Sequence, residues 1–480
     1  MPDVIEIVGA TTNVIEVVAP GLQGPTGPIG PIGEVTPEGI AEALTGWIAE
    51  DDSVAEPGIG MADEFGFVVS DWNRLGITWG TQTRFTTTQM SNSVISIVED
   101  TDHEEVRLTD AAGFYSVLGT SPVETPAATV EAPKWSDGAR LNAVSAKLAR
   151  LLASEAITVR IGITGDSWTD RKIIPQALAD RLYAAYGQGG DGWITMARAT
   201  SYCINDVTRS AFTNFTIADL DDDTPDDPPY GPDGYRVDCV TSTGAISFTD
   251  IRAESLVLYY RNTTGVFRYR VNGGAWSTVT GGGTNDPAKV TMASGLSTAG
   301  VHTVDIDTTG NAGTVSIYGI RATGIEGVEL FKCGNGGAIA SEMATAASSA
   351  TADFILADMA VDAVVIVCGT NDETQNVAAA DFRAAMISLA SSWTQHATVS
   401  GVLFACPPQN GTLSAPSMAD YGEVMQEAYA DGIGEYINFA RLWSDYDTEN
   451  ASAMWLDTLH LDAGGAQRFS GYIFNRFFNL

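Results

Sequence analysis

Three short segments of the chain combine the residue types that acyl-transfer chemistry uses. They are Gly165-Asp166-Ser167, Gly369-Thr370-Asn371-Asp372 and Asp457-Thr458-Leu459-His460. The first offers a hydroxyl nucleophile, the second a side-chain amide for an oxyanion, and the third a base with a carboxylate three residues before it. Each segment also has a purely structural interpretation, because Asp, Ser and Asn are common at helix N-termini and in turns.

The chain contains four histidines, and they differ in what stands beside them. His103 lies in a charged segment, His302 in an alternating strand pattern, and His396 at the end of a predicted helix. His460 alone has a carboxylate at a useful spacing, so one turn of chain would bring Asp457 to its ring and hold its tautomer. The alternative is an exposed histidine in a loop.

These segments follow predicted strands of an α/β fold. Apolar runs at 157–164 and 363–368 end just before the first two segments, and a predicted helix follows each. Strands and helices alternate over 137–200 and again after 350, which is typical of a parallel sheet with helices on both faces. Ligands bind such sheets beyond the carboxyl ends of the strands. We therefore expect Ser167 and Asn371 at the same edge.

Residues 205–325 have a different pattern. Short runs with a period of two are separated by turns such as Asn272-Gly273-Gly274, which predicts a β-sandwich inserted into the α/β domain. Its aromatic residues are interpreted mainly as core, with sugar stacking as the alternative, and they include Tyr259, Tyr260, Tyr269 and Trp276. The acidic run 219–227 is interpreted as a solvated loop rather than a calcium site, because it lacks the EF-hand spacing.

The N-terminal part has a fibrous pattern. Two similar strand-like runs, 4–8 and 14–18, precede a glycine at every third position from Gly21 to Gly33. That period predicts a short collagen-like triple helix, and the alternative is a flexible linker. The predicted domains are 1–35 (β segment and Gly-x-y stretch), 36–135 (a helix at 36–50, a β-rich connector and a linker), 136–204 with 326–480 (α/β domain), and 205–325 (sandwich).

Composition excludes several classes of protein. The 480 residues carry a formal net charge of −35, which disfavours binding to nucleic acid or to an anionic membrane surface. Five cysteines without regular spacing predict neither a disulfide framework nor a zinc site. The apolar runs are too short to cross a membrane, and the first residues do not read as a signal peptide. The sequence has no G-x-S-x-G or HExxH motif, and no P-loop or GxGxxG follows a predicted strand, so we expect no metal and no cofactor.

The three segments together resemble the SGNH, or GDSL-like, serine ester hydrolase family over about 137–200 and 330–480. The resemblance implies a flavodoxin-like parallel sheet, with Ser167 as nucleophile, His460 as general base and Asp457 as its orienting partner. It also implies an oxyanion hole from the Ser167 N–H, the Asn371 side chain and a glycine N–H. We assign that glycine to Gly337 within Gly334-Asn335-Gly336-Gly337-Ala338, with Gly336 as the alternative.

The front of the chain resembles phage tail-fibre and minor tail proteins, through its β segment and Gly-x-y stretch. This resemblance implies a component of the virion tail that contacts other tail proteins and acts at the host cell surface, and the collagen-like period predicts a homotrimer. The substrate would be an ester, for example an O-acetyl group, on a host glycan or lipid. The competing hypothesis is a structural or receptor-binding tail protein that uses the hydrolase fold only as a scaffold.

Overall fold

The structure is a computed structural model, and it divides into two units, Met1–Glu131 and Ala132–Leu480. It describes residues 134–222, 228–396, 401–412 and 415–480, together with short strands in the first unit. The division falls close to the boundary predicted after residue 135.

The first unit is described only as short antiparallel strands. The two similar runs near the N-terminus form a strand pair, β1 with β2. The Gly-x-y stretch and the helix predicted at 36–50 lie outside the described residues. The strands are β1 (Val4–Val8), β2 (Val14–Val18), β3 (Gly60–Met61), β4 (Phe67–Val68), β5 (Thr78–Trp79), β6 (Thr83–Arg84), β7 (Ser96–Asp100), β8 (Glu105–Asp110) and β9 (Gly113–Ser116).

A six-stranded parallel sheet forms the centre of the α/β part of the second unit, with the order β11-β23-β10-β24-β25-β26. Apart from the edge strand β11, this is the 2-1-3-4-5 order of flavodoxin-like folds, counted along the chain. The strands are β10 (Thr158–Gly165), β11 (Gln188–Gly190), β23 (Gly327–Gly334), β24 (Ala363–Val367), β25 (Gly401–Cys406) and β26 (Glu435–Asn438).

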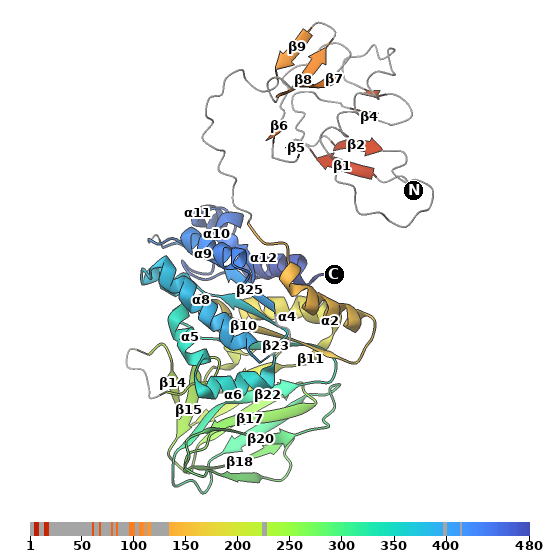
Figure 1. Ribbon diagram of the computed structural model, residues 1–480. Helices are drawn as coiled ribbons and strands as arrows, with labels where there is room; N and C mark the ends of the chain where they lie inside the picture. Colours follow the sequence, from red (N-terminus) through yellow and green to blue (C-terminus); the bar gives the residue numbers. More distant parts are fainter. Residues whose placement is uncertain are drawn as a thin grey trace. The chain divides into compact units, whose positions relative to one another are not determined.

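Helices cover both faces of this sheet (Figure 1). One face packs against α5 (Ala340–Ala347), α6 (Ala350–Met359), α8 (Ala379–Thr394) and α9 (Met418–Ala430). The other packs against η1 (Ala139–Leu141), α2 (Asn142–Leu152), α4 (Ile173–Tyr186), α10 (Phe439–Leu442), α12 (Ala463–Ile473) and η3 (Phe474–Phe478). In β24, Val364 and Ile366 face the first core and Val365 and Val367 the second, so the continuous apolar run reflects burial on both faces.

The insertion between β11 and β23 is a pair of packed antiparallel sheets around its own core. One sheet has the order β14-β15-β22-β17-β20, with β12 paired to β22, and the other β13-β16-β21-β18-β19. The elements are β12 (Gly192–Thr195), η2 (Thr200–Tyr202), β13 (Thr208–Thr213), β14 (Thr216–Asp219), β15 (Tyr235–Cys239), β16 (Ala245–Ile251), β17 (Ser255–Arg261), β18 (Val266–Val271), β19 (Ser277–Thr280), β20 (Pro287–Ala293), β21 (His302–Asp307) and β22 (Val315–Thr323).

The insertion begins earlier than the predicted residue 205. Strand β12 was assigned to the α/β part, but it pairs antiparallel with β22 of the sandwich. This run is short and fully buried, so its pattern does not show which sheet it joins. Only the pairing with β22, far along the chain, decides its place.

The sandwich packs tightly on the α/β part. The Tyr259 hydroxyl in β17 donates to Asp358 of α6 over 2.8 Å, and Lys289 forms an ion pair with the same carboxylate. Trp193 and Tyr318 belong to the core cluster that also contains residues of α5 and α6. A shared apolar core and polar contacts therefore hold the insertion against the sheet domain.

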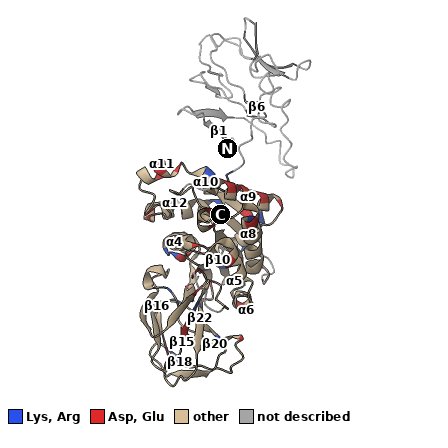
Figure 2. Cartoon of the chain, turned by 90° about the vertical axis from the view of Figure 1, so that its left-hand side faces the viewer, with Lys and Arg blue, Asp and Glu red and all other residues tan. Residues whose placement is uncertain are grey.

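The surface of the second unit is acidic. Figure 2 shows Asp and Glu positions, in red, along helices such as α9 and α11 (Tyr446–Ala451). All five cysteines are free and buried, as small hydrophobic residues often are. Within the described ranges, no helix is both long and apolar enough to span a bilayer.

Candidate active site

Three loops leave the sheet side by side at its carboxyl edge. Strand β10 lies between β23 and β24, and Gly165 pairs in register with Gly334 on one side and Val367 on the other. A Cβ on Gly165 would stand 1.8 Å from the Val367 carbonyl oxygen, and its φ is +142°. Only glycine fits this close approach, which brings the Ser167 turn against the end of β24.

Ser167 begins the short helix α3 (Ser167–Asp170), and Asp166 caps it. The Asp166 Oδ1 accepts the Trp168 N–H over 3.0 Å, so the capping interpretation of this segment is correct for the aspartate. Asp166 is fully buried, and this burial, with the nearby Asp372 charge, raises its pKa to about 7. The cap directs the serine, which is partly exposed, away from the buried strand end.

Trp168 connects the nucleophile turn to the histidine loop. It is almost fully buried, and its ring meets those of Trp455 and Phe469 at centroid distances of 6.0 and 5.6 Å. Trp455 lies two residues before Asp457 and bridges to Leu461 across the turn. Trp168 therefore fixes α3 relative to the turn that carries His460.

Ser167, His460 and Asp457 form one hydrogen-bonded chain. The Ser167 Oγ lies 2.8 Å from His460 Nε2. The other ring nitrogen, Nδ1, lies 2.9 and 3.0 Å from the two carboxylate oxygens of Asp457. This geometry matches the nucleophile, base and orienting acid of a serine hydrolase triad.

The turn itself anchors Asp457. Its Oδ1 accepts the backbone N–H groups of Leu459 and His460 over 2.8 and 2.7 Å. Burial acts to raise the pKa of this carboxyl, but these N–H groups and the imidazole together lower it below its usual value. The carboxylate therefore stays ionised and correctly placed for the ring.

His460 is tuned toward its neutral form. Burial lowers its pKa below 6.5 and outweighs the opposing effect of Asp457. Arg171 adds to the lowering, and its guanidinium lies 3.8 Å from an Asp457 oxygen. A neutral imidazole is the form that accepts a proton from serine.

The predicted oxyanion donors lie in the loops on either side of Ser167. A Cβ on Gly336 would stand 3.8 Å from the Ser167 Cβ, so this glycine is directly beside the nucleophile. The Gly336 N–H donates to the Tyr235 hydroxyl over 3.3 Å. The Gly337 N–H, by contrast, has no partner among the described residues. This arrangement favours Gly337 as the donor. Asn371, in α7 (Thr370–Thr374), gives one amide hydrogen to the Ala338 carbonyl over 3.0 Å and keeps a second.

A buried polar cluster beside Ser167 was not found from the sequence. Asp170, at the end of α3, forms a salt bridge of 2.7 Å with Arg198 and lies 3.8 Å from the Lys332 Nζ. The Tyr235 hydroxyl, from β15 of the insertion, joins the same group. No spacing in the sequence links these residues, so only the fold reveals the cluster.

The other histidines, the acidic run and the aromatic residues singled out from the sequence are not part of the active site. His302 bonds Asn272 and the Ser297 carbonyl, and His396 pairs with Asp353. Residues 223–227 of the acidic run lie outside the described residues, and among the described ones no cluster of acidic, His or Cys side chains is suited to a metal. Tyr259 and Tyr269 are buried, as the core interpretation expects.

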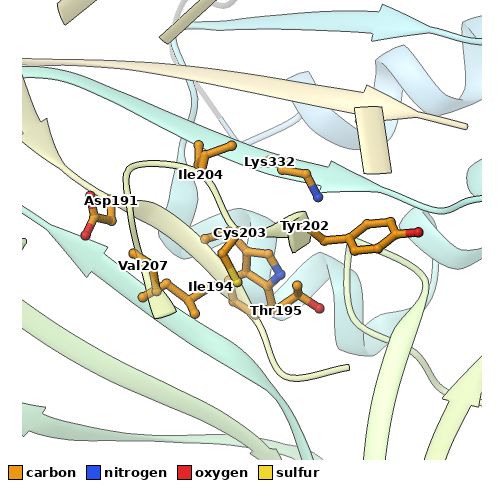
Figure 3. Close-up of a pocket in the computed structure, with 9 residues that line it drawn as sticks. Asp191, Ile194, Thr195, Tyr202, Cys203, Ile204, Val207 and Lys332 are labelled. Carbon is orange, nitrogen blue, oxygen red and sulfur yellow. The ribbon is translucent and has the colours of Figure 1, made fainter. Parts of the chain in front are cut away.

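A small cavity lies between the insertion and the sheet (Figure 3). Its lining includes Ile194, Cys203, Val207 and the buried Lys332, and it has room for about one water molecule. None of the triad residues lines it. It is therefore a packing gap next to the polar cluster rather than a substrate pocket.

The chain is similar to known proteins in its fold rather than in its sequence. No family model matches the chain, and the curated proteins contain no match. A solved structure described as "Peptidoglycan O-acetylesterase in action, 5 min" is 18% identical, covering 72% of this chain and 97% of that chain, with a TM-score of 0.59. A family two carbohydrate esterase from Clostridium thermocellum in complex with cellohexaose is 13% identical, covering 55% and 98%, with a TM-score of 0.27.

The second unit therefore has an SGNH hydrolase-like fold, the fold class of carboxylic ester hydrolases. The likeness to the peptidoglycan O-acetylesterase structure and the parallel sheet order agree on this class. A β-sandwich is inserted between β11 and β23, and its Tyr235 bonds Gly336, the glycine beside the serine.

Proposed function

We propose that the chain is a serine esterase that removes O-acyl groups, most simply acetyl, from a cell-envelope glycan or lipid. The observation that carries this proposal is the chain of contacts from Ser167 Oγ through both ring nitrogens of His460 to Asp457. A histidine with only a structural role in a loop would not require both contacts. Here one ring nitrogen lies 2.8 Å from a serine hydroxyl, and the other contacts a carboxylate.

The proposed reaction is acyl transfer through a covalent intermediate. His460 Nε2 takes the Ser167 proton as Oγ attacks the ester carbonyl carbon, and the oxyanion is held by N–H donors of Ser167, Gly337 and Asn371. The imidazolium then protonates the departing alcohol oxygen. A water molecule, deprotonated by the same nitrogen, attacks the acyl-enzyme and releases a carboxylic acid and free Ser167.

Two observations support an acetylated glycan as the substrate: a similar solved structure and the residues on the insertion. The similar structure with a TM-score of 0.59 is described as a peptidoglycan O-acetylesterase. On the insertion, the half-buried Trp276 carries the Arg268 and Arg270 guanidinium groups over its ring, each 4.5 Å from the centroid, so this corner combines an aromatic ring with hydrogen-bond donors for a sugar. We extend the proposal to carbohydrate binding by the insertion.

We further propose that the enzyme is displayed in three copies in a virion tail and acts at the host surface with other tail proteins as partners. The support is the N-terminal Gly-x-y run from Gly21 to Gly33. Light scattering of the full chain tests the copy number. A monomer mass would contradict the trimer without affecting the esterase proposal.

The Ser167→Ala variant tests the catalytic proposal. It should abolish p-nitrophenyl acetate hydrolysis and acetate release from O-acetylated peptidoglycan, while its melting temperature stays near that of the wild type. Ser452→Ala is the matched control, because Ser452 is exposed and its hydroxyl bonds only the Thr448 carbonyl in the described structure. Equal activity of Ser167→Ala and the wild type would favour the non-catalytic scaffold instead.

A further inference from the structure

The Tyr235 hydroxyl carries a contact from the insertion into the active site. Tyr235 is the first residue of β15 and is 1% exposed. Its oxygen accepts the Gly336 N–H over 3.3 Å and an N–H of Arg198, and its hydrogen is directed to Asp170 over 3.4 Å. A phenol has one hydrogen to donate and two lone pairs, so these three partners use its full capacity.

Gly336 is the point at which this network meets the nucleophile. The position of a Cβ on Gly336 lies 3.0 Å from Asp170, 3.3 Å from Arg198 Nη2 and 3.8 Å from the Ser167 Cβ. The next peptide carries the N–H of Gly337, the predicted oxyanion donor. The backbone conformation at Gly336 therefore sets the direction of that N–H, and a glycine needs such external restraint because its backbone is intrinsically free.

A second contact holds the same loop from the insertion. The Asn335 side chain is fully buried and donates to Asp219 of β14 over 3.0 Å. Its backbone N–H bonds the Gly165 carbonyl over 2.9 Å, which ties the loop to the nucleophile strand. A Cβ on Gly234 would stand only 2.6 Å from the Asn335 amide nitrogen. The loop is thus clamped between β10 and the insertion.

The charges around Tyr235 keep the clamp rigid. Arg198 is bound to Asp170 through both Nε and Nη2, and its guanidinium lies 4.5 Å from the centroid of the Tyr235 ring. Burial raises the pKa of the Tyr235 phenol well above its usual value, so the hydroxyl stays protonated over the working pH range. The Tyr235 hydroxyl therefore keeps its one hydrogen for Asp170.

We propose that the inserted β-domain is a working part of the catalytic site, with Tyr235 as a positioning residue that holds loop 334–337 so that the Gly337 N–H faces the oxyanion. The inference rests on the proposed esterase function. The insertion then does more than recruit substrate, because its removal or misplacement would weaken the reaction on every ester, including one without a sugar.

The test compares two tyrosine variants on p-nitrophenyl acetate, which has no glycan to bind. Tyr235→Phe removes the hydroxyl that holds Gly336. Tyr259→Phe is the matched control, because it removes another buried hydroxyl between the insertion and the α/β part, bonded to Asp358 away from the triad. We expect Tyr235→Phe to lower kcat at least about tenfold with KM within about twofold, since small misplacements of catalytic groups have large rate effects. Tyr259→Phe should retain the wild-type kcat.

A second pair of variants reaches the network through the cation that binds Asp170, and it serves if Tyr235→Phe does not fold. Arg198→Met should lower kcat with little change in KM, and Arg198→Lys should recover part of the loss because it keeps a cation and a donor beside Asp170. A wild-type kcat in folded Tyr235→Phe, or in both Arg198 variants, overturns the positioning role while Ser167→Ala remains inactive. If the wild type itself is no more active than Ser167→Ala, the esterase proposal fails and this inference fails with it.

Discussion

Replacing Asp457 by Asn should disable the enzyme without unfolding it. The side-chain oxygen of Asn can still accept the Leu459 and His460 N–H groups that Oδ1 now accepts over 2.8 and 2.7 Å. The amide NH₂, however, would face His460 Nδ1 in place of the carboxylate oxygen at 3.0 Å. Nδ1 must then accept, which puts the ring proton on Nε2, where it can no longer take the proton of Ser167.

The size of this effect follows from the exposure of the carboxylate. The same change in a well-buried triad costs about 10⁴-fold in kcat. The Asp457 side chain is 45% exposed, so water can replace part of its effect on the ring. We therefore expect kcat/KM to fall about 10³-fold, equivalent to about 4 kcal/mol in the activation barrier.

The assay is kcat/KM for p-nitrophenyl acetate at neutral pH, with thermal melting to check folding. Asp462→Asn is the matched control, since Asp462 caps α12 through the Gly465 N–H and asparagine caps helices equally well. That control should keep wild-type activity. A loss below about tenfold in Asp457→Asn, with the protein folded, would refute the assignment of Asp457 as the orienting acid.

Two further predictions concern pH. Arg171→Gln removes a cation that lowers the pKa of His460, so that pKa should rise and the acid limb of the kcat/KM profile should move to higher pH; an unchanged or lower limb would contradict this reasoning. The Asp166 carboxyl has a pKa of about 7 in the folded protein and 3.8 in the unfolded chain, so the folded state binds its proton more tightly. The stability that this proton contributes is complete below pH 3.8 and is lost as pH rises through 7. The loss between pH 5 and 8 is about 2.5 kcal/mol, and urea unfolding of Asp166→Asn should show correspondingly less decrease than the wild type. An identical decrease in both proteins would show that Asp166 does not titrate in this range.

Local patterns were sufficient to predict most of the α/β elements. The stripe of Phe382, Met386, Leu389 and Trp393 is buried in α8, because a helix repeats every 3.6 residues and its apolar positions identify one face. The all-apolar run of β24 predicts a strand covered on both faces. The spacing of Asp457 and His460 predicts their contact, since one turn of chain joins them.

The contact between Ser167 and His460, which lie far apart in the chain, could be predicted only from the resemblance of the three motifs to a known family. The two residues are 293 positions apart, and their local patterns do not show that the Ser167 hydroxyl lies 2.8 Å from His460. The capping and catalytic interpretations of the first segment both hold, because Asp166 caps the helix and the Ser167 hydroxyl contacts His460. Neighbouring residues can carry the two roles at once.

Tertiary structure decided the features that depend on packing between the insertion and the sheet. Strand β12 joins the sandwich, and the Tyr235 hydroxyl reaches Gly336 across 101 positions of sequence. The raised pKa of Asp166 depends on complete burial, which no pattern of neighbours reveals. Periodicity and motif spacing report on residues within a few turns of one another, whereas hydrogen bonds and desolvation depend on which distant surfaces meet, and that is determined only when the whole domain has folded.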